Sequence, residues 1–292
     1  MNMAVLLQYI LPKQAITALA GKLAHYHGGN LTTSVITWFV KRYQVNMAEA
    51  ANPDVASYKT FNDFFTRPLK AGARPIAQAD FICPVDGAIS QFGTIEKDQI
   101  FQAKGHSYST TALVGGDQAL AEKFENGHFA CLYLSPKDYH RIHMPCDGTL
   151  KSMTYVPGAL FSVNPTTAQG VPGLFARNER VVCEFTSAQH ASFIMVLVGA
   201  TIVGSMATVW HDENNGIINP PRTGKTKTWN FDEKNITLRQ GDEMGRFLLG
   251  STVVMLFEKD TLQFNADWQP ARAIRLGEVM GKKCQPISGR VI

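Results

Sequence analysis

The chain changes its pattern of apolar and polar residues near residue 80. Before that point, apolar residues recur at the three- and four-residue spacing of amphipathic helices. The pattern predicts one helix beginning at Pro12, a second capped by Thr32 to Ser34, and a short third one over Thr60 to Phe65. Residues 1–78 are therefore expected to form an N-terminal helical region.

From about residue 80 onward, short apolar runs alternate with Gly, Pro, Asn and Asp, which is typical of an antiparallel β core. The polar stretch from Trp210 to Asn235 is expected to form a long loop or hairpin. The fold class is therefore α+β, with amphipathic helices first and a mostly antiparallel β domain over residues 79–292. The expected strands are 88–95, 129–135, 149–156, 180–186, 192–205, 246–257 and 271–276.

The last long apolar run, from Gly245 to Phe257, contains the pair Gly250-Ser251 in its middle. Apolar residues on both sides of the pair indicate a strand buried on both faces. Gly in a strand marks a bulge or a close backbone approach, and a buried Ser hydroxyl needs a hydrogen-bond partner. From these residues alone, a β-bulge with a satisfied hydroxyl is the simpler interpretation.

Composition narrows the classes of function. The net charge of +4 is too small to indicate nucleic-acid binding. Residues 1–50 carry four basic side chains against Glu49 alone, so the N-terminal helices either lie on an anionic membrane surface or pack on the core. No apolar run reaches the roughly 18 residues of a spanning helix, and no cleaved signal peptide is indicated. Five cysteines without a C-x-x-C pair argue against a disulfide framework and for a reducing compartment.

Three polar sites of the β region can carry chemistry. Asp86 lies in a Pro-x-Asp-Gly sequence, which alone indicates only a turn. His140 and His143 could share one helical face, but no further ligand stands at a suitable spacing, so acid–base work is favoured over metal binding. Asp86, His143 and Ser251 follow the chain order Asp, His, Ser that some catalytic triads use. The absence of G-x-S-x-G argues against an α/β-hydrolase.

A set of longer motifs accompanies these sites. The tetrapeptide Leu249-Gly250-Ser251-Thr252 occurs together with a His-x-x-His segment. The full set is Tyr9-Ile10-Leu11-Pro12-Lys13, Phe61-x-x-Phe64-Phe65-x-Arg67-Pro68-Leu69, Pro84-x-Asp86-Gly87, Gln102-Ala103-Lys104-Gly105-His106, Tyr139-His140-Arg141-x-His143-Met144-Pro145, Tyr155-Val156-Pro157-Gly158, Phe175-Ala176-Arg177-Asn178-Glu179-Arg180 and Leu249-Gly250-Ser251-Thr252. Over nearly its whole length the sequence resembles the pyruvoyl-dependent phosphatidylserine decarboxylases of bacteria and mitochondria.

The resemblance implies a self-cleaving proenzyme. His143 as base and Asp86 as its orienting partner would let Ser251 attack the carbonyl of Gly250. The products would be a β chain of residues 1–250 and an α chain of 251–292 that carries a pyruvoyl group derived from Ser251. That covalent group is the cofactor expected, with no metal. It would form a Schiff base with phosphatidylserine and act as an electron sink while CO₂ leaves, giving phosphatidylethanolamine, with His140 as the acid–base group.

The resemblance also implies partners and a location. The expected partners are phosphatidylserine, an anionic membrane surface and the second product of self-cleavage, which would form an α/β heterodimer. A dimer of these heterodimers is left open. The expected location is peripheral, on the cytoplasmic face of the inner or cell membrane.

Two other classes of function are left open. A serine hydrolase would use Asp86, His143 and Ser251 without cutting its own chain. A non-catalytic lipid-binding β protein would contain Gly250-Ser251 only as a bulge. Both alternatives require an intact chain, whereas the decarboxylase requires a cut between Gly250 and Ser251.

Overall fold

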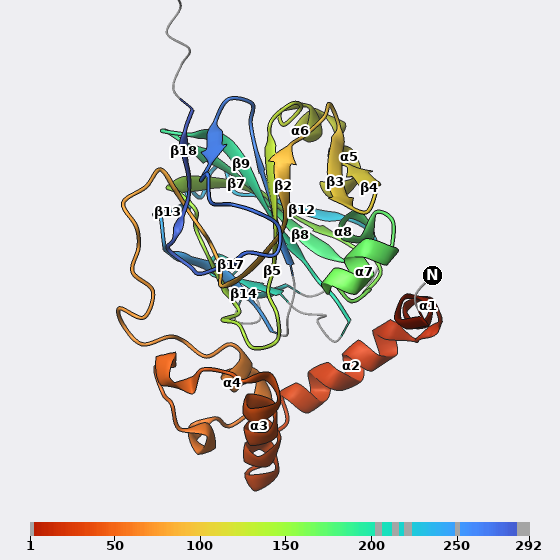
Figure 1. Ribbon diagram of the computed structural model, residues 1–292, viewed down its shortest axis with the longest axis vertical. Helices are drawn as coiled ribbons and strands as arrows, with labels where there is room; N and C mark the ends of the chain where they lie inside the picture. The colour runs from red at the N-terminus through yellow and green to blue at the C-terminus, as the bar shows by residue number, and fades with distance from the viewer. Residues whose placement is uncertain (1–2, 202–205, 212–215, 219–223, 249–251, 285–292) are drawn as a thin grey trace, which may run out of the picture.

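The computed structural model describes residues 3–201, 206–211, 216–218, 224–248 and 252–284 (Figure 1). The α+β class is confirmed, because helices dominate the N-terminal part and antiparallel strands dominate the rest. The helices are α1 (Met3–Ile10), α2 (Lys13–Ala24), α3 (Asn30–Tyr43), α4 (Phe61–Phe65), α5 (Thr110–Leu113), α6 (Gln118–Glu122), α7 (Pro165–Gly170) and α8 (Leu174–Arg177), with 3-10 turns η1 (Met47–Glu49) and η2 (Val55–Ser57).

The N-terminal helices follow the predicted pattern with one correction. α2 begins directly after Pro12, and α4 begins with a capping box in which Thr60 and Asp63 each accept the other's backbone N–H. The predicted cap of the second helix is wrong. α3 begins at Asn30, and its N-cap is Gly29 with φ 54, a left-handed conformation that a glycine adopts without strain. α1 is an additional helix that the pattern did not predict.

A nine-stranded antiparallel sheet forms the centre of the β domain. Its order is β12-β7-β8-β9-β15-β5-β2-β17, and β13 also pairs with β7. β15 lies between β9 and β5, and all its residues are buried. The strands are β2 (Gly87–Thr94), β5 (His128–Tyr133), β7 (Gly148–Val156), β8 (Arg180–Ser187), β9 (Ala191–Val198), β12 (Lys227–Asn230), β13 (Thr237–Leu238), β15 (Thr252–Phe257) and β17 (Ala273–Ile274).

Three smaller antiparallel sheets complete the described β structure. They have the orders β11-β10-β14-β6, β1-β18-β16 and β3-β4. Their strands are β1 (Phe81–Ile82), β3 (Gln99–Ala103), β4 (His106–Ser109), β6 (Arg141–His143), β10 (Met206–Thr208), β11 (Ile217–Ile218), β14 (Glu243–Phe247), β16 (Leu262–Phe264) and β18 (Val279–Lys283).

The predicted strands agree with the structure except in the last third of the chain. Four of them (88–95, 129–135, 149–156 and 180–186) match β2, β5, β7 and β8 with ends shifted by two residues or fewer. The single strand predicted over 246–257 is wrong. Its two ends belong to β14 and β15, which lie in different sheets. The segment between these two strands, 249–251, lies outside the described residues.

Other predicted segments differ in extent. β9 ends at Val198, so the strand predicted over 192–205 is too long, and its last four residues lie outside the described part. The strand predicted over 271–276 shortens to β17. The stretch predicted as a loop from Trp210 to Asn235 contains the short strands β11 and β12, while 212–215 and 219–223 lie outside the described residues.

Two apolar clusters form the interior of the described chain. The larger fills the β domain and includes Val5 of α1, which packs near α7 (Figure 1). The smaller consists of Ile36, Val45, Phe64 and Phe65 and holds α3 and α4 together. Because Val5 belongs to the larger cluster, the N-terminal region is tied to the β domain at α1 as well as near α4. The division of the chain at residue 78 stays a prediction.

Gly87, the first residue of β2, should not tolerate a larger side chain. A Cβ placed on Gly87 would lie 2.4 Å from the backbone oxygen of Tyr133 in β5, and a backbone atom cannot move aside cheaply. Gly87→Ala should therefore lower the free energy of unfolding by about 1–3 kcal/mol. The matched control is Gly21→Ala in α2, where a Cβ would meet no atom within 4 Å. It should leave stability unchanged or raise it slightly. Urea denaturation measures both, and equal midpoints would contradict the close approach of β2 to β5.

Candidate active site

His143 ends β6 and holds a defined tautomer. Its backbone N–H donates to Pro84 O at 2.9 Å, which places it beside the turn that leads into β2. Ring atom Nδ1 lies 2.8 Å from Gly241 O, and a carbonyl oxygen only accepts, so Nδ1 carries the proton. Nε2 then accepts from the Tyr139 hydroxyl at 3.1 Å. Burial lowers the pKa of His143 below its usual 6.5, so the ring is neutral at neutral pH.

His140 is fully buried beside the helical region. Its Nδ1 lies 2.8 Å from Asp138 O, so Nδ1 again carries the proton and Nε2 presents a lone pair. That Nε2 has no hydrogen-bond partner among the described residues. The ring packs on Phe65 of α4 at 4.0 Å between centroids. Burial lowers the pKa of His140 to about 3, so this ring also stays neutral.

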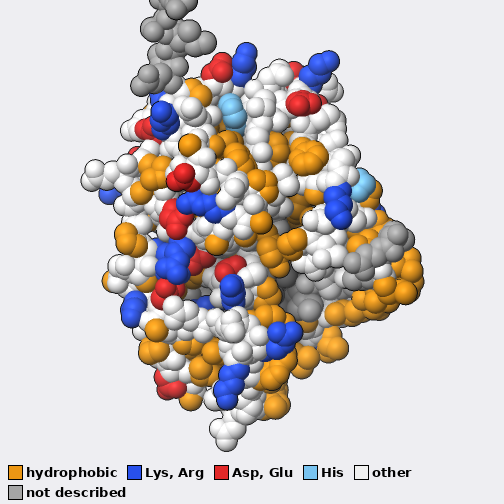
Figure 2. Space-filling model, in the orientation of Figure 1, with side chains coloured by type: hydrophobic (Ala, Val, Ile, Leu, Met, Phe, Trp, Pro, Cys, Tyr) orange, Lys and Arg blue, Asp and Glu red, His pale blue; other side chains and the backbone are white. Residues whose placement is uncertain are grey.

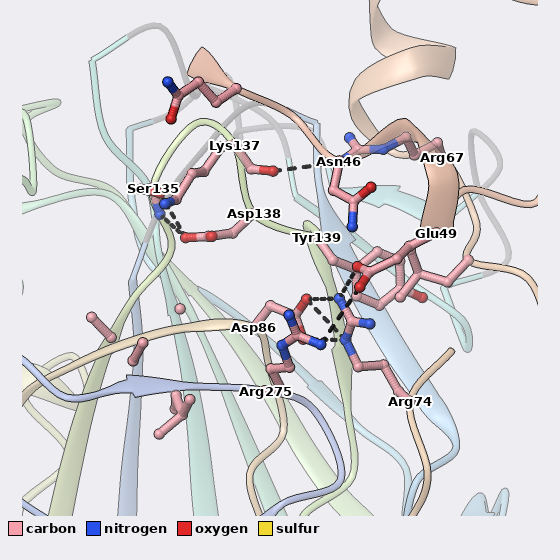
Figure 3. A pocket seen from close by; sticks show the side chains of 16 residues that line it. Asn46, Glu49, Arg67, Arg74, Asp86, Ser135, Lys137, Asp138, Tyr139 and Arg275 are labelled. Atoms are coloured by element: carbon pink, nitrogen blue, oxygen red, sulfur yellow. Dashed lines mark hydrogen bonds and ion pairs between the residues drawn. The ribbon is translucent and has the colours of Figure 1, made fainter. Parts of the chain in front are cut away.

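Asp86 lies at the start of β2 and is held by Arg74. The guanidinium donates from Nε to both carboxylate oxygens, at 2.9 and 3.0 Å, and from Nη2 to Oδ2 at 2.5 Å (Figure 3). The Leu276 backbone N–H donates to Oδ1 at 2.9 Å. Nη2 of Arg74 also donates to Glu49 at 2.7 Å. Arg74 thus binds two carboxylates, one from each part of the chain.

The segment that contains Gly250 and Ser251 lies outside the described residues, but the residues on both sides of it are placed. On one side, Phe247 N donates to His140 O at 3.0 Å. On the other, Thr252 pairs with Tyr133 in β5 and Val198 in β9. Thr252 is buried, and its Oγ1 has no hydrogen-bond partner among the described residues. The described chain therefore contacts His140 at Phe247, before the Gly250-Ser251 pair, and enters the main sheet at Thr252, after it.

The described site residues among those predicted, Asp86, His140 and His143, lie in one region but not in the expected contacts, and Ser251 lies outside the described residues. Both ring nitrogens of His143 have partners other than Asp86, which binds Arg74 instead. The expected helical face for His140 and His143 is wrong, because His143 is in a strand and His140 precedes it in non-helical backbone. Titration of the pair near neutrality is not supported either, since burial lowers the pKa of both rings. Whether Asp86, His143, Ser251 and His140 act as expected stays a prediction.

A cavity of about 470 Å³ adjoins Asp86 between the helical region and the β domain (Figure 3). Charged side chains from both parts of the chain, Glu49 and Arg275 among them, lie in its wall, and Tyr139 connects it to His143 through the hydroxyl hydrogen bond. Arg67 lies in this wall, donating to Phe64 O and Lys137 O, and its Nε has no partner among the described residues. Burial raises the pKa of Asp138 in the same wall. The cavity offers polar access to the carboxylate of Asp86.

Sequence reasoning missed the groups that contact these residues. Arg74 stood in a stretch that the pattern indicates as an extended connector, and nothing local marked it as a partner of Asp86. Gly241 acts through its backbone carbonyl, which leaves no side-chain signal. Tyr139 directly precedes the His-x-x-His motif and lies four residues before His143. It is the one of the three that the sequence could have suggested, because a tyrosine hydroxyl can donate to a histidine nitrogen.

No group of three or more His, Cys, Asp or Glu side chains suited to a metal ion occurs among the described residues. The described site offers proton transfer by neutral imidazoles, together with two carboxylates held by Arg74. Neutral His143 has its Nε2 lone pair on the side of Tyr139, and neutral His140 has a free, buried Nε2 lone pair.

Comparisons with known proteins agree with the motifs. A family model described as phosphatidylserine decarboxylase matches residues 61–282, and a second model described as PSD matches residues 3–44. The phosphatidylserine decarboxylase proenzyme of Dechloromonas aromatica is 75% identical over 280 residues, covering 96% of this chain and 98% of the relative.

Two further relatives match this chain over a similar share of its length. The phosphatidylserine decarboxylase proenzyme of an Azoarcus species is 68% identical over 287 residues, covering 98% of each chain. That of Herminiimonas arsenicoxydans is 63% identical over 287 residues, covering 98% of this chain and 96% of the relative.

Acid should destabilise the fold through His140. An unfolded chain binds a proton at this ring near pH 6.5, whereas the buried ring stays neutral down to about 3. Between these values the unfolded state binds more protons, so stability is lost as pH falls, by about 1.4 kcal/mol per pH unit. Urea unfolding of Ser251→Ala protein should show this slope, and adding His140→Gln should make it shallower. Equal slopes in the two proteins would argue against a neutral, buried His140.

Proposed function

The chain belongs to the phosphatidylserine decarboxylase family, and we propose that its own Asp86, His143 and Ser251 carry out the self-cleavage that produces a pyruvoyl group at position 251. The enzyme converts phosphatidylserine to phosphatidylethanolamine and CO₂, a step of phospholipid biosynthesis, and is made as a proenzyme. One observation supports the assignment of residues more than any other: Phe247, which precedes the Gly250-Ser251 pair, donates its backbone N–H to His140 O, and Thr252, which follows the pair, lies in the main sheet between β5 and β9.

In the proposed self-cleavage, the Ser251 hydroxyl attacks the carbonyl carbon of Gly250. The proton of the hydroxyl passes to His143 Nε2 and then to the departing Ser251 nitrogen, so that an ester replaces the peptide bond. Loss of the Ser251 Cα proton breaks the Cβ–O bond of the ester and releases a chain that ends in the Gly250 carboxylate. The dehydroalanine left at position 251 takes up water and loses ammonia, which leaves the pyruvoyl group.

The described hydrogen bonds of His143 suit the role of base. Gly241 O accepts from Nδ1–H, which fixes the tautomer that leaves Nε2 free to take a proton. The lowered pKa keeps Nε2 unprotonated at neutral pH, as a base requires. Tyr139 donates to Nε2, so its hydroxyl has to give way to the Ser251 hydroxyl for the attack. Asp86 contributes a fixed negative charge that favours the imidazolium formed in the step.

Two buried polar atoms of the described site suit different partners: the Thr252 hydroxyl can donate to a carbonyl oxygen, whereas the lone pair of His140 Nε2 needs a donor such as an amine. His140 Nε2 and Thr252 Oγ1 are both buried, and neither has a hydrogen-bond partner among the described residues. Such orphaned polar atoms are costly unless another group completes them. A pyruvoyl group supplies a carbonyl that binds the amine of the substrate and accepts the electron pair released when CO₂ leaves. We propose that His140, through its Nε2 lone pair, moves a proton at the substrate and that Thr252 Oγ1 donates a hydrogen bond.

The N-terminal helices supply the proposed contact with an anionic membrane surface. Of the 16 large apolar side chains that are exposed in the described chain, 12 lie in residues 3–38. Figure 2 shows apolar side chains gathered along the lower right, where α1 and α2 run in Figure 1. The same region carries an excess of basic residues over acidic ones, which favours anionic lipids. None of the described helices has the length and hydropathy to cross a bilayer. We place the enzyme peripherally, on the cytoplasmic face.

The cleavage products should remain together as a heterodimer. The piece after residue 250 supplies β15 to the centre of the main sheet, where it pairs with β5 and β9 of the longer piece. It also supplies β17, which pairs with β2, and β18, which pairs with β1. Separating the pieces would expose these buried strands, so one cut bond does not release the shorter chain.

Intact mass under denaturing conditions tests the self-cleavage. Wild-type protein should give two chains that break after Gly250, the smaller one blocked by a pyruvoyl group. Ser251→Ala and His143→Ala should each give a single full-length chain, and Asp86→Asn should slow cleavage at least about tenfold, since it removes the charge that stabilises the imidazolium. His140→Ala should still cleave but should decarboxylate phosphatidylserine at least about a hundredfold more slowly, as expected on loss of a proton-transfer group.

Two controls separate the alternatives. An uncut wild-type chain that a fluorophosphonate labels at Ser251 would indicate a serine hydrolase. An uncut His140→Ala protein would contradict the division of roles between the two histidines, and a cut His143→Ala protein would remove His143 from the base role.

Flotation on vesicles tests the membrane contact. Leu19 and Leu23 on α2 are 60% and 64% exposed, and burying one such side chain contributes about 1.5–3 kcal/mol. Leu19→Gln with Leu23→Gln should therefore weaken binding to phosphatidylcholine–phosphatidylserine vesicles at least about tenfold, without changing self-cleavage. Phe101→Thr, which removes an apolar side chain of similar exposure from β3, is the matched control and should bind normally. An equal loss of vesicle binding in the α2 double variant and in Phe101→Thr would mean that α2 has no special role in membrane contact.

A further inference from the structure

Arg74 makes most of the hydrogen bonds that hold the Asp86 carboxylate. Its guanidinium is the source of three of the four hydrogen bonds that Asp86 accepts in the described structure, and the Leu276 N–H is the source of the fourth. The carboxylate is 9% exposed and the guanidinium 8% exposed, so solvent contributes little to either. Arg74 also donates to Ala73 O at 2.7 Å, which fixes the orientation of the planar group.

Burial makes this ion pair a requirement for an ionised Asp86. A carboxylate removed from water without a cation binds its proton or disrupts the fold, because the desolvation penalty is several kcal/mol. A planar guanidinium that donates two parallel bonds fixes both the charge and the direction of the carboxylate. Asp86 makes no hydrogen bond to His143 in the described structure, so its effect on that ring depends on where Arg74 holds it.

Glu49 is the second carboxylate that binds Arg74. It lies in η1 of the helical region, accepts from Arg74 Nη2 at 2.7 Å, and lies 3.5 Å from Arg275 (Figure 3). The hydrogen bond with Arg74 lowers the pKa of Glu49, and the hydrogen bond with Asp86 raises the pKa of Arg74 further. Two carboxylates then share one buried guanidinium, and Arg275, which lies 3.5 Å from Glu49 but is largely exposed, brings the four side chains to a net charge of zero. An imidazolium at His143 would then depend on the charge of Asp86 itself, the less exposed of the two carboxylates.

We propose that Arg74 is a positioning residue for self-cleavage, which holds Asp86 ionised and in place for His143, and that Glu49 supports it from the helical region. The proposal rests on the proposed role of Asp86 in cleavage. In this proposal Arg74 acts through Asp86 rather than on the reacting atoms. The geometry therefore predicts that the defect of an Arg74 variant lies in how fast the chain cuts itself, and that a guanidinium ion supplied from solution compensates for it.

The experiment follows self-cleavage of the full chain made in a cell-free system. After synthesis is stopped, the appearance of the 251–292 fragment gives a rate constant. Arg74→Gly should cleave at least tenfold more slowly than wild type, and millimolar guanidinium chloride should restore a substantial part of the rate, whereas sodium chloride at equal concentration should not. The cleavage rate of Arg74→Lys should lie between those of Arg74→Gly and wild type. An ammonium group keeps the positive charge but lacks the two parallel N–H donors of a guanidinium. Glu49→Gln should slow cleavage less than Arg74→Gly does.

A matched variant controls for the loss of an ion pair elsewhere. Lys123 pairs with Glu184 at 2.8 Å, outside the site, and Lys123→Gln should cleave at the wild-type rate with no response to guanidinium.

Asp86→Asn, measured alongside, separates failure of this inference from failure of the proposed function. Wild-type cleavage in Arg74→Gly together with slow cleavage in Asp86→Asn would overturn the role of Arg74 and leave that of Asp86 intact. Wild-type cleavage in Asp86→Asn would instead overturn the assignment of Asp86. If neither added guanidinium nor the Arg74→Lys substitution gives faster cleavage than Arg74→Gly alone, Arg74 has a general structural role. That result would overturn its proposed role in positioning Asp86.

Discussion

The pairing of β15 with strands on both of its sides is the constraint on which the rest of the site depends. Each residue from Thr252 to Phe257 is buried, and each pairs with β5 on one side and β9 on the other. Buried backbone groups must be hydrogen-bonded, so this strand has one register only. The main chain directly after residue 251 therefore has a fixed place. The chain directly before residue 249 is also fixed, because β14 pairs with β6 and β10 in a different sheet.

The change of sheet between β14 and β15 bears on the proposed cleavage site, which lies between these two strands in the sequence. Had one continuous strand run through residues 246–257, its ladder would have held every peptide in place, and an attack on the Gly250 carbonyl would have had to break buried hydrogen bonds. The chain instead leaves one sheet after Phe247 and enters another at Thr252. The cut that we propose falls in the connection, while the strands on both sides keep the two products in register.

The sequence predicted the main sheet well because its signal is local. Runs of apolar residues bounded by Gly, Pro and Asp located β2, β5, β7 and β8 to within two residues. The break between β14 and β15 left no such signal, since Phe247, Leu248 and Thr252 are all buried and hydropathy does not register a change of partner strand. Asp86, His140 and His143 were identified from residue type and from the family motifs. Their partners were not, because Arg74 lies 12 residues from Asp86 and Gly241 lies 98 residues from His143.

The helical region forms part of the wall of the site. The region proposed to contact the membrane therefore also contacts the residues proposed for the chemistry. Phe65 of α4 packs on the ring of His140, and Arg141 Nε donates to Thr66 O at the end of the same helix. Glu49 reaches Asp86 through Arg74. α4 in turn packs on α3, whose outer side exposes Trp38 and Val35. A phospholipid whose chains stay in the bilayer can bring only its headgroup to the protein. An apolar surface on α3, which packs on the helix that contacts His140, would bring that headgroup to the site without removing the lipid from the membrane.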